Sequence, residues 1–393
     1  MDPQFELVES LSDLDAIASK LSTQKLLAID IEADSLHHYF PKVCLIQVST
    51  TKQTFIIDPL AIQTVKPLHQ LLERKDIKKL FHGADFDLRS LFRDYSIKVN
   101  NIFDTMIGSQ FLGEKEPGLA AVLKKRFDVD LNKQYQKANW SKRPLSHDML
   151  AYAAHDTTHL FRLYSEVKQE LSSKERLGWV EEECKRLSVV CTTTTKPSPA
   201  GQGTNGQILD NTPLFIRFSG AGAMTPRDLA VLERLLRFRD RRAMEQDKPP
   251  FKIFGNVLIK ELVKEKPTEH SELKRLRRLP RNFMKRYAKE TLAAIKTGLA
   301  IQKDHLPSYP KIPRPPKNLP KQARLKKLKK WRKTKASQLE IYPGLICNNN
   351  LLNTLAEKNP AHIDDLKEVP QMRIWQMEVF GKEIVDVLSR SET

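Results

Sequence analysis

A stretch that is poor in apolar side chains divides the sequence into two halves. Residues 191–207, CTTTTKPSPAGQGTNGQ, are rich in Thr, Gly and Pro, which is a composition typical of linkers. A chain of 393 residues is long enough for two or three domains with cores of their own. We therefore expect separate domains on the two sides of this stretch.

The first half has the pattern of an α/β domain, which we place at residues 1–190. Four strands are expected, within LLAIDIEA, VCLIQVST, TFIID and IKKLFHG. Helices are expected from Asp85, over 104–112 and 118–127, and from Ser146, which suits a helix N-cap. Three closely spaced strands followed by strand–helix alternation predict a mixed sheet with helices packed on it.

The second half has a helical pattern, apart from a short strand expected at LFIRF, and it repeats itself. An offset of 93 residues brings nine identities together without a gap, which indicates two copies of one small helical domain. The identities are Arg239/Arg332, Ala243/Ala336, Pro250/Pro343, Ile253/Ile346, Asn256/Asn349, Leu258/Leu351, Leu262/Leu355, Pro267/Pro360 and Leu273/Leu366. The expected layout is a linker at 191–212, helical domains at 213–303 and 321–393, and a Pro-rich basic connector at 304–320.

Positive charge is concentrated in the second half. The net charge is +18, yet residues 1–190 hold 26 Lys and Arg against 27 Asp and Glu, while the remainder holds 40 against 21. Residues 311–335 carry 12 basic side chains and no acidic one. We expect chemistry in the first half and contacts with a polyanion, favouring nucleic acid, in the second. A solvated linker and a nuclear-targeting run remain alternatives for 311–335.

Several classes of protein do not fit the sequence. No apolar run approaches the roughly 18 residues that a membrane-spanning helix needs, and the acidic N-terminus lacks the features of a signal peptide. Four cysteines without CxxC spacing indicate neither a zinc site nor a disulfide framework. We expect a protein of the reducing cytoplasm, without an organic cofactor and without a partner protein that the sequence could name.

One carboxylate lies in an apolar helical stripe. Met149, Ala153, Asp156, Leu160, Leu163 and Val167 follow one another at helical spacing. A buried charge is costly unless it is paired. Asp156 therefore either lies at the edge of the stripe, in contact with water, or has a cation, a strong hydrogen-bond donor or a metal as its partner.

Asp30 and Glu32 are two residues apart on an expected strand, so both side chains leave the same face. Two like charges on one face repel unless a cation lies between them, and such oxygen ligands suit Mg²⁺ or Mn²⁺. An edge strand that faces solvent would give the same spacing.

Two further acids follow in FHGADFDLRSL, where Asp85 suits a helix N-cap and Asp87 could project over the sheet edge. Tyr152 precedes Asp156 by one helical turn. A phenol there is well placed to orient and deprotonate an attacking water, although a packed aromatic ring is the alternative.

Together these motifs resemble the DEDD 3′–5′ exonucleases, and more closely the ribonuclease D family. The order is D-x-E, H-G-x-x-x-D-L and Y-x-x-x-D, with NWSKRPL shortly before the last. The resemblance covers about residues 5–190, and the repeated helical unit resembles the HRDC domain, which that family carries in two copies. The implied fold is a ribonuclease-H-like exonuclease domain followed by two small all-α domains.

The resemblance implies a set of metal ligands and a reaction. Asp30, Glu32, Asp87 and Asp156 would hold two divalent ions, with Asp30 bridging them, and Tyr152 would position the water that attacks the last phosphodiester. Nucleoside 5′-monophosphates would then leave a free RNA 3′ end one at a time. Two residues depart from the family pattern: Ile31 stands where Thr is usual, and His155 replaces a small residue. Ile31 should point away from the metals, whereas His155 could touch the substrate or tune the site.

The leading hypothesis is therefore an exoribonuclease that acts on structured RNA such as tRNA precursors. A proofreading-type DNA exonuclease would share the four acids, but the chain has no polymerase or helicase region. A non-catalytic nucleic-acid-binding protein built around HRDC domains is a third hypothesis, against which the intact set of acids and the tyrosine argue.

Overall fold

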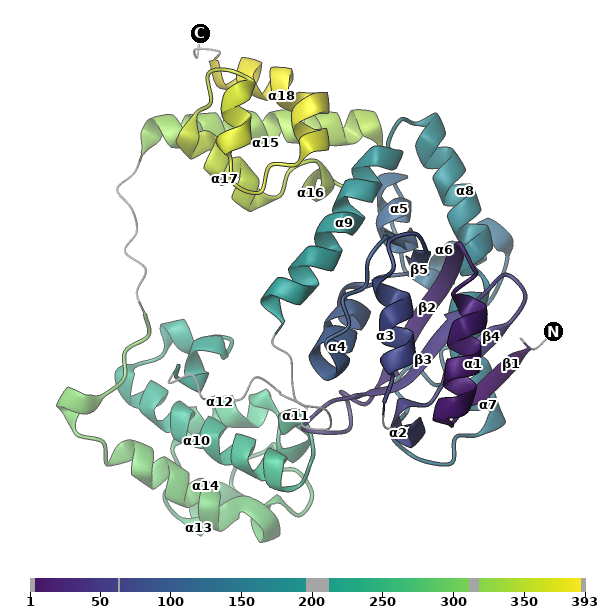
Figure 1. Cartoon of the computed structure of the whole chain (residues 1–393). Coiled ribbons are helices and arrows are strands. Elements are labelled where there is room, and N and C mark those ends of the chain that lie inside the picture. The colour runs from purple at the N-terminus through teal and green to yellow at the C-terminus, as the bar shows by residue number, and fades with distance from the viewer. Residues whose placement is uncertain (1–3, 63, 196–211, 311–317, 390–393) are drawn as a thin grey trace. The chain divides into compact units, whose positions relative to one another are not determined.

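The structure is a computed structural model that describes residues 4–62, 64–195, 212–310 and 318–389 (Figure 1). Two compact units can be distinguished, and each is described by itself. The first comprises residues 1–33, 43–200 and 315–393, and the second comprises residues 34–42 and 201–314.

A six-stranded mixed sheet forms the centre of the first unit, in the order β1-β4-β3-β2-β5-β6. The strands are β1 (Phe5–Val8), β2 (Leu26–Ala33), β3 (Val43–Ser49), β4 (Thr54–Ile57), β5 (Lys78–Phe81) and β6 (Ile102–Asp104). β2 is antiparallel to β3 and parallel to β5. The mixed sheet and four of its strands confirm the sequence analysis. β1 and β6 were missed, because β1 is exposed at its two central residues and β6 has only three residues, so neither shows the pattern of a buried strand.

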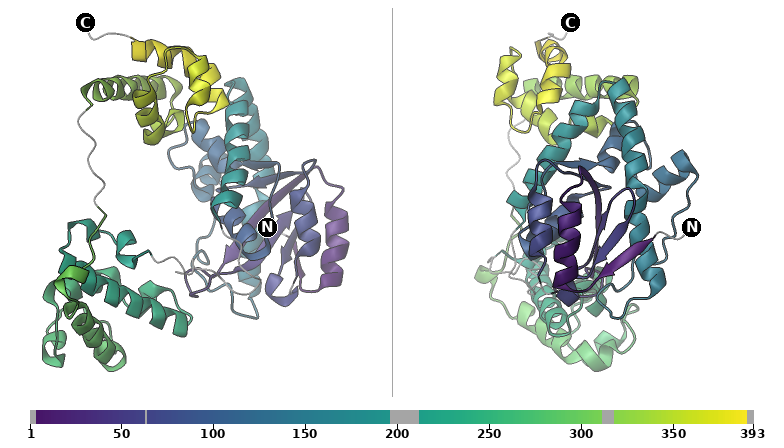
Figure 2. Two further views of the ribbon diagram at one scale, coloured as in Figure 1. Left: turned by 60° about the vertical axis from the view of Figure 1, so that its left-hand side comes forward. Right: turned by 45° about the vertical axis from the view of Figure 1, so that its right-hand side comes forward.

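Helices cover both faces of this sheet (Figure 2). On one face, α1 (Leu11–Leu21), α3 (Lys66–Glu73) and α4 (Asp85–Tyr95) pack on an apolar layer that includes Leu27, Ile29 and Ile31. On the other face, α7 (His147–Thr158) packs on β2, β3 and β4. The remaining helices of this domain are α2 (Pro59–Ile62), α5 (Thr105–Phe111), α6 (Leu119–Phe127), α8 (Leu160–Ser173) and α9 (Leu177–Thr194). No helix in the described part of the chain is long and apolar enough to cross a lipid bilayer.

Four local expectations from the sequence need correction: two about helices, one about a strand and one about the linker. The helix expected from Ser146 is capped there, since the Ser146 hydroxyl accepts from the Met149 N–H, but it divides at His159 into α7 and α8. Asp85 is not an N-cap, because α4 is preceded by Ala84 and the Asp85 carboxylate pairs with Arg89 at 3.0 Å. LFIRF forms a 3₁₀ helix rather than a strand. The expected linker begins inside α9, and most of it, residues 196–211, lies outside the described residues.

Two small helical domains follow the α/β domain along the chain. The first contains η1 (Leu214–Arg217), η2 (Ala221–Ala223), α10 (Pro226–Glu245), α11 (Pro250–Ile253), α12 (Asn256–Glu265), α13 (His270–Lys274), α14 (Phe283–Leu299) and η3 (Lys303–His305). The second contains α15 (Leu319–Leu339), α16 (Pro343–Ile346), α17 (Asn349–Lys358), η4 (Asp364–Glu368) and α18 (Ile374–Ser389). Part of the connector expected at 304–320, residues 311–317, lies outside the described residues.

The repeat seen in the sequence is a structural repeat, because equivalent residues make equivalent bonds. Arg239 donates to the Phe254 carbonyl oxygen and to Asn256 Oδ1, at 3.2 and 2.8 Å. Arg332 donates to the Cys347 carbonyl oxygen and to Asn349 Oδ1, at 2.7 and 3.1 Å. In each copy the arginine ties the long first helix to the start of α12 or α17.

The second helical domain packs against α9 within the first unit. Trp179 of α9 stacks on Trp375 with ring centroids 4.7 Å apart, and Arg373 pairs with Glu183 at 2.7 Å. The Glu182 carboxylate accepts from the Ile374 and Trp375 N–H groups, both at 2.9 Å, and so caps the start of α18. The sequence did not predict these contacts, since the intervening linkers suggested independent domains.

In the second unit, the segment between β2 and β3 packs with the first helical domain. Tyr39 is buried in that domain's apolar core. Asp247 accepts from the Tyr39 backbone N–H at 3.0 Å, and its other carboxylate oxygen lies 2.6 Å from His38 Nδ1. Residues 34–42 thus belong to the core of this unit although they interrupt the α/β domain in sequence.

The paired arginine contacts lead to a prediction about stability. Changing Arg239 or Arg332 to Ala should lower the stability of the corresponding helical domain by about 1–3 kcal/mol, because a part-buried carbonyl oxygen loses its charged donor. Amide hydrogen exchange in α12 and α17 measures the two domains separately. Arg241→Ala is the matched control, since Arg241 is exposed and makes only a 3.9 Å contact with Glu245. Equal exchange rates in all three variants would contradict the prediction.

Candidate active site

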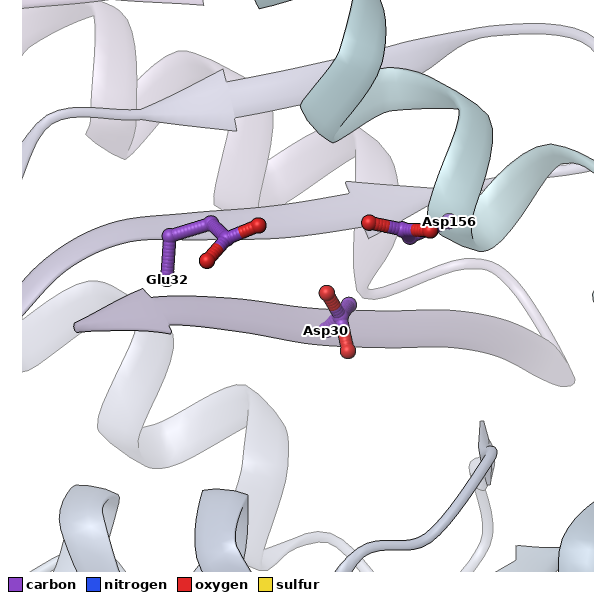
Figure 3. A group of neighbouring side chains, drawn as sticks. All are labelled: Asp30, Glu32 and Asp156. Atoms are coloured by element: carbon purple, nitrogen blue, oxygen red, sulfur yellow. The ribbon is translucent and has the colours of Figure 1, made fainter. Parts of the chain in front are cut away.

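Three carboxyl groups converge between the sheet and α7 (Figure 3). Asp30 and Glu32 leave β2 on the face that α7 covers, while Ile29 and Ile31 point into the core on the opposite face. Asp156 comes from the last turns of α7. Each of the three acids offers one oxygen atom such that all three oxygens lie within 4.8 Å of one another. The strand spacing therefore places Asp30 and Glu32 on the same face, as predicted. Their strand, β2, lies between β3 and β5 and is not an edge strand.

The protein environment disfavours the charged form of these acids. Burial is the largest cause that raises the pKa of Asp30 and of Glu32, and the neighbouring carboxylates of Asp87 and Asp156 raise both further. Burial also raises the pKa of Asp156 to about 7. A hard divalent cation would remove this repulsion and would find the oxygen ligands it prefers. The donor set thus fits Mg²⁺ or Mn²⁺.

Asp87 lies beside this cluster rather than within it. It is in the first turn of α4 and only 7% exposed, and it is not among the three acids whose oxygens lie within 4.8 Å. Its pKa is raised to about 7, first by burial and then by Asp104. Among the neighbouring charges, Asp87 has the largest effect on the pKa of Asp30. Of the four predicted ligands, the structure brings three together and holds the fourth close enough to interact electrostatically.

The turn that orients Asp87 depends on a residue that the sequence analysis missed. The Asp104 carboxylate accepts from the Gly83 and Ala84 N–H groups, at 2.9 and 2.8 Å, immediately before α4. It also caps α5 by accepting from the Met106 N–H at 2.8 Å. Gly83 has φ +86°, a conformation that favours glycine. An acid between a strand and a helix is the sequence signal that could have identified Asp104 as a cap.

Tyr152 lies on α7 one turn before Asp156 and is part of an aromatic group. Its ring centroid is 5.8 Å from that of Tyr135 and 6.0 Å from that of Trp140. Burial, and then the charges of Asp156, Glu32 and Asp30, raise the pKa of the phenol above its ordinary value. The ring therefore packs as an aromatic side chain does, while its hydroxyl is close enough to the acids to feel their charge.

A cavity of about 310 Å³ adjoins Tyr152 and Asp156. His155 of α7 and His159, which lies between α7 and α8, line it together with Tyr135, and the two imidazole rings are nearly parallel. The pKa of His159 is lowered by burial, then by His155 and Arg162, which favours the neutral form of this imidazole. His155, which departs from the family pattern, thus faces the cavity rather than the apolar core.

Comparison with known proteins agrees with this fold. A family model described as 3′–5′ exonuclease matches residues 5–172, and one described as HRDC domain matches residues 228–295 and 321–388. A ribonuclease D of Bartonella henselae is 28% identical over 98% of this chain and 90% of its own length.

Solved structures give the same result for the fold. The crystal structure of Escherichia coli RNase D matches with a TM-score of 0.68 and 20% identity over 98% of both chains. The catalytic core of RRP6 from Trypanosoma brucei matches with a TM-score of 0.62 and 28% identity, over 76% of this chain and 82% of that one.

The fold and the carboxylate cluster define a 3′–5′ exonuclease that carries two HRDC domains. This chain belongs to the ribonuclease D family of 3′–5′ exoribonucleases, which are hydrolases of RNA phosphodiester bonds. The two helical domains are its HRDC domains. The predicted family and fold class are thereby confirmed.

The raised pKa values predict how the metal-free protein responds to pH. Asp87 and Asp156 have folded-state pKa values of about 7, whereas an unfolded aspartate titrates near about 3.9. Between these values the folded state binds more protons than the unfolded state, so stability falls as pH rises from about 4 to about 7. Asp156→Asn removes one such group and should lose less stability over this range.

Differential scanning calorimetry in EDTA between pH 4.5 and 8 tests this expectation. The melting temperature of the wild type should fall relative to that of Asp156→Asn as pH rises, and saturating Mg²⁺ should reverse the difference at pH 8. Parallel curves for the two proteins would show that Asp156 titrates as an ordinary exposed carboxyl group.

Proposed function

We propose that this exoribonuclease shortens RNA from a free 3′ end by a two-metal mechanism, and that its cytoplasmic substrates are structured RNAs such as tRNA precursors. The observation that supports the mechanism best is the convergence of Asp30, Glu32 and Asp156 within 4.8 Å, with Asp87 buried beside them. These four acids are the proposed ligands. When bound, two divalent ions would activate the attacking water and stabilise the leaving 3′-oxygen.

Tyr152 is proposed to orient the water rather than to remove its proton. The nearby carboxylates and burial favour the protonated phenol at neutral pH. A neutral hydroxyl can donate one hydrogen bond and accept another, which is what holding a water near the scissile phosphate requires. The aromatic contacts with Tyr135 and Trp140 fix the ring in place. This refines the sequence-based hypothesis, in which the phenol also deprotonated the water.

The cavity beside Tyr152 is proposed to receive the terminal nucleotide. Its 310 Å³ lies at the lower end of the range of about 300–1,000 Å³ typical of small-molecule sites. Asp130 and Asp148 line it together with the rings of Tyr135 and His155. Carboxylates repel phosphate but accept hydrogen bonds from ribose hydroxyls and base amino groups. The lining therefore suits the sugar and base of a nucleotide. The phosphate of that nucleotide would face the four acids proposed to hold the metal ions.

Substitution of the proposed ligands and of Tyr152 tests the mechanism. Asp30→Asn, Glu32→Gln, Asp87→Asn and Asp156→Asn should each lower turnover by at least about 100-fold, since even changes around a metal site cost 10–100-fold. Tyr152→Phe keeps the ring and should lower turnover by about 10²-fold, the size of effect expected when a reacting group is no longer held in position. Mn²⁺ affinity should survive in Tyr152→Phe and fall in the acid variants.

The assay uses 3′-labelled RNA and DNA oligomers of the same sequence, with and without Mn²⁺. Glu166→Gln is the control, since Glu166 is a partly exposed acid of α8 that belongs neither to the cavity lining nor to the proposed metal set. Near wild-type turnover in any acid variant would remove that residue from the ligand set. Faster digestion of DNA than of RNA would favour the DNA exonuclease alternative.

The second HRDC domain is proposed to hold the body of the RNA. Lys326, Lys329, Lys330 and Lys333 are exposed on α15 and follow one another at helical spacing, so they share one face. A row of cations on one helix face is the electrostatic footprint of nucleic-acid binding. Substituting the lysines is a better test than deleting the domain, because deletion would expose the face of α9 that packs against it.

Changing these four lysines together to Gln should weaken binding to a tRNA-like precursor and reduce its salt dependence. On single strands, the slope of log K against log[salt] falls in magnitude by about 0.7 for each phosphate that a lysine no longer neutralises, and thus by up to about 3 in total. Binding is measured over a salt series in the Asp156→Asn background, which leaves the RNA intact. Lys20→Gln with Lys52→Gln is the control. An unchanged slope in the fourfold variant would mean that the charge of α15 is a solvated face.

A further inference from the structure

A fully buried glutamine lies among the apolar residues of β3 with no hydrogen-bond partner in the described part of the chain. Gln47 has 0% exposure, and neither its Nε2 nor its Oε1 atom has a partner there. A buried amide that makes no hydrogen bond loses its bonds to water on folding and destabilises the folded state. Such groups are rare in native proteins, so Gln47 requires an explanation.

The strand register shows which way Gln47 points. Gln47 is directly opposite Asp30 in the antiparallel pair of β2 and β3, and Ala28 is opposite Ser49. Residues that are directly opposite place their side chains on the same face. Ser49 confirms which face this is, because its hydroxyl lies 2.6 Å from the Thr157 hydroxyl of α7. The Gln47 amide therefore lies in the layer between the sheet and α7, the layer that holds the carboxylate cluster.

Other groups in this layer do not account for the amide. The hydroxyls of Ser49, Thr54 and Thr157 are engaged with one another, at 2.6 and 2.7 Å. Around them the layer is apolar, since Leu45, Ile56, Ala153 and Ala154 form a buried cluster. The remaining polar groups on this face include the acids, the Tyr152 hydroxyl and the Trp140 indole N–H. Of these, the Asp30 carboxylate belongs to the residue directly opposite Gln47. Side chains that are directly opposite in an antiparallel pair have Cβ atoms about 4.5–5.5 Å apart, so a glutamine amide can reach an aspartate carboxylate.

We propose that Gln47 is a positioning residue for the metal site, which donates an N–H···O hydrogen bond from Nε2 to the Asp30 carboxylate when that carboxylate holds a cation. This inference rests on the proposed function, in which Asp30 is a ligand. Groups that hydrogen-bond to metal ligands fix the orientation of those ligands and increase metal affinity. The bond would limit rotation of the Asp30 carboxyl group, so that the same oxygen faces the ion in each catalytic cycle.

The choice of side chain is consistent with this role. A glutamate at position 47 would have a similar shape but would add another negative charge to acids that already repel one another. A leucine would fill similar space in the apolar layer but could not donate a hydrogen bond. Glutamine is neutral and can donate, and the stability lost by burying its amide is the kind of cost that functional sites carry.

Gln47→Leu separates a positioning role from a packing role. If Gln47 positions Asp30, this variant should melt at the same or a higher temperature in EDTA, since an unpaired amide has been removed. Its affinity for Mn²⁺, measured by titration calorimetry without RNA, should fall by about 10–100-fold. Turnover should fall by a similar factor while KM for RNA stays unchanged, because the RNA-binding surfaces are intact.

Thr291→Val provides a matched control. Thr291 lies on α14 of the first HRDC domain, is 0% exposed, and its hydroxyl also has no partner among the described residues. Removing that hydroxyl should change the melting temperature in the same direction as Gln47→Leu. It should leave Mn²⁺ affinity and turnover at wild-type values, because the domain contributes no acid to the cluster.

The inference is overturned if Gln47→Leu folds and keeps wild-type Mn²⁺ affinity and turnover. Should that variant fail to fold, Gln47→Met is measured in its place, since its unbranched side chain adapts to the space left by glutamine. Asp30→Asn distinguishes this failure from failure of the proposed function. Loss of Mn²⁺ binding in Asp30→Asn together with normal binding in the Gln47 variants would refute only the role of Gln47. Normal binding in Asp30→Asn would remove Asp30 from the ligand set and so contradict the proposed function on which this inference rests.

Discussion

Repulsion among half-buried carboxyl groups is the constraint on which the rest of the α/β domain depends. Asp30, Glu32 and Asp156 meet between the sheet and α7, where the charge of Asp156 raises the pKa of both Asp30 and Glu32. Without a cation the site favours protonated acids. The apolar layer on the opposite face of the sheet, which includes Leu27 and Ile29, stabilises the strand that carries two of them. The domain thus maintains a costly arrangement that a divalent ion would relieve.

Contacts between distant parts of the chain hold the acids in register. Ser49 and Thr157 connect β3 to α7 by their hydroxyls, close to Asp156. Asp104, at the end of β6, fixes the turn from which α4 starts and so sets the place of Asp87. The first contact joins residues that are 108 apart in sequence, and the second joins residues that are 20 and 21 apart. An active site of this kind is therefore a property of the whole sheet rather than of any one motif.

The two HRDC domains share internal hydrogen bonds but pack against different parts of the chain. Arg239 and Arg332 make equivalent bonds in the two copies. In the second copy, Trp375 and Arg373 also contact α9. The first copy instead shares a unit with residues 34–42, whose Tyr39 lies in its core. The internal bonds specify the domain, whereas residues outside them decide what each copy packs against.

The sequence by itself determined the mixed α/β class, the repeat and the pairing of Asp30 with Glu32, because these depend on spacing along one element. It also marked Asp156 as a polar residue in an apolar stripe, and Gln47 carries the same signal within VCLIQVS. Only the tertiary structure decided that α7 ends before His159, that Asp104 anchors the turn before α4, and that Gln47 lies opposite Asp30. The reason is physical: a periodic pattern reports which face of an element is buried, but the neighbour that buries it comes from elsewhere in the chain.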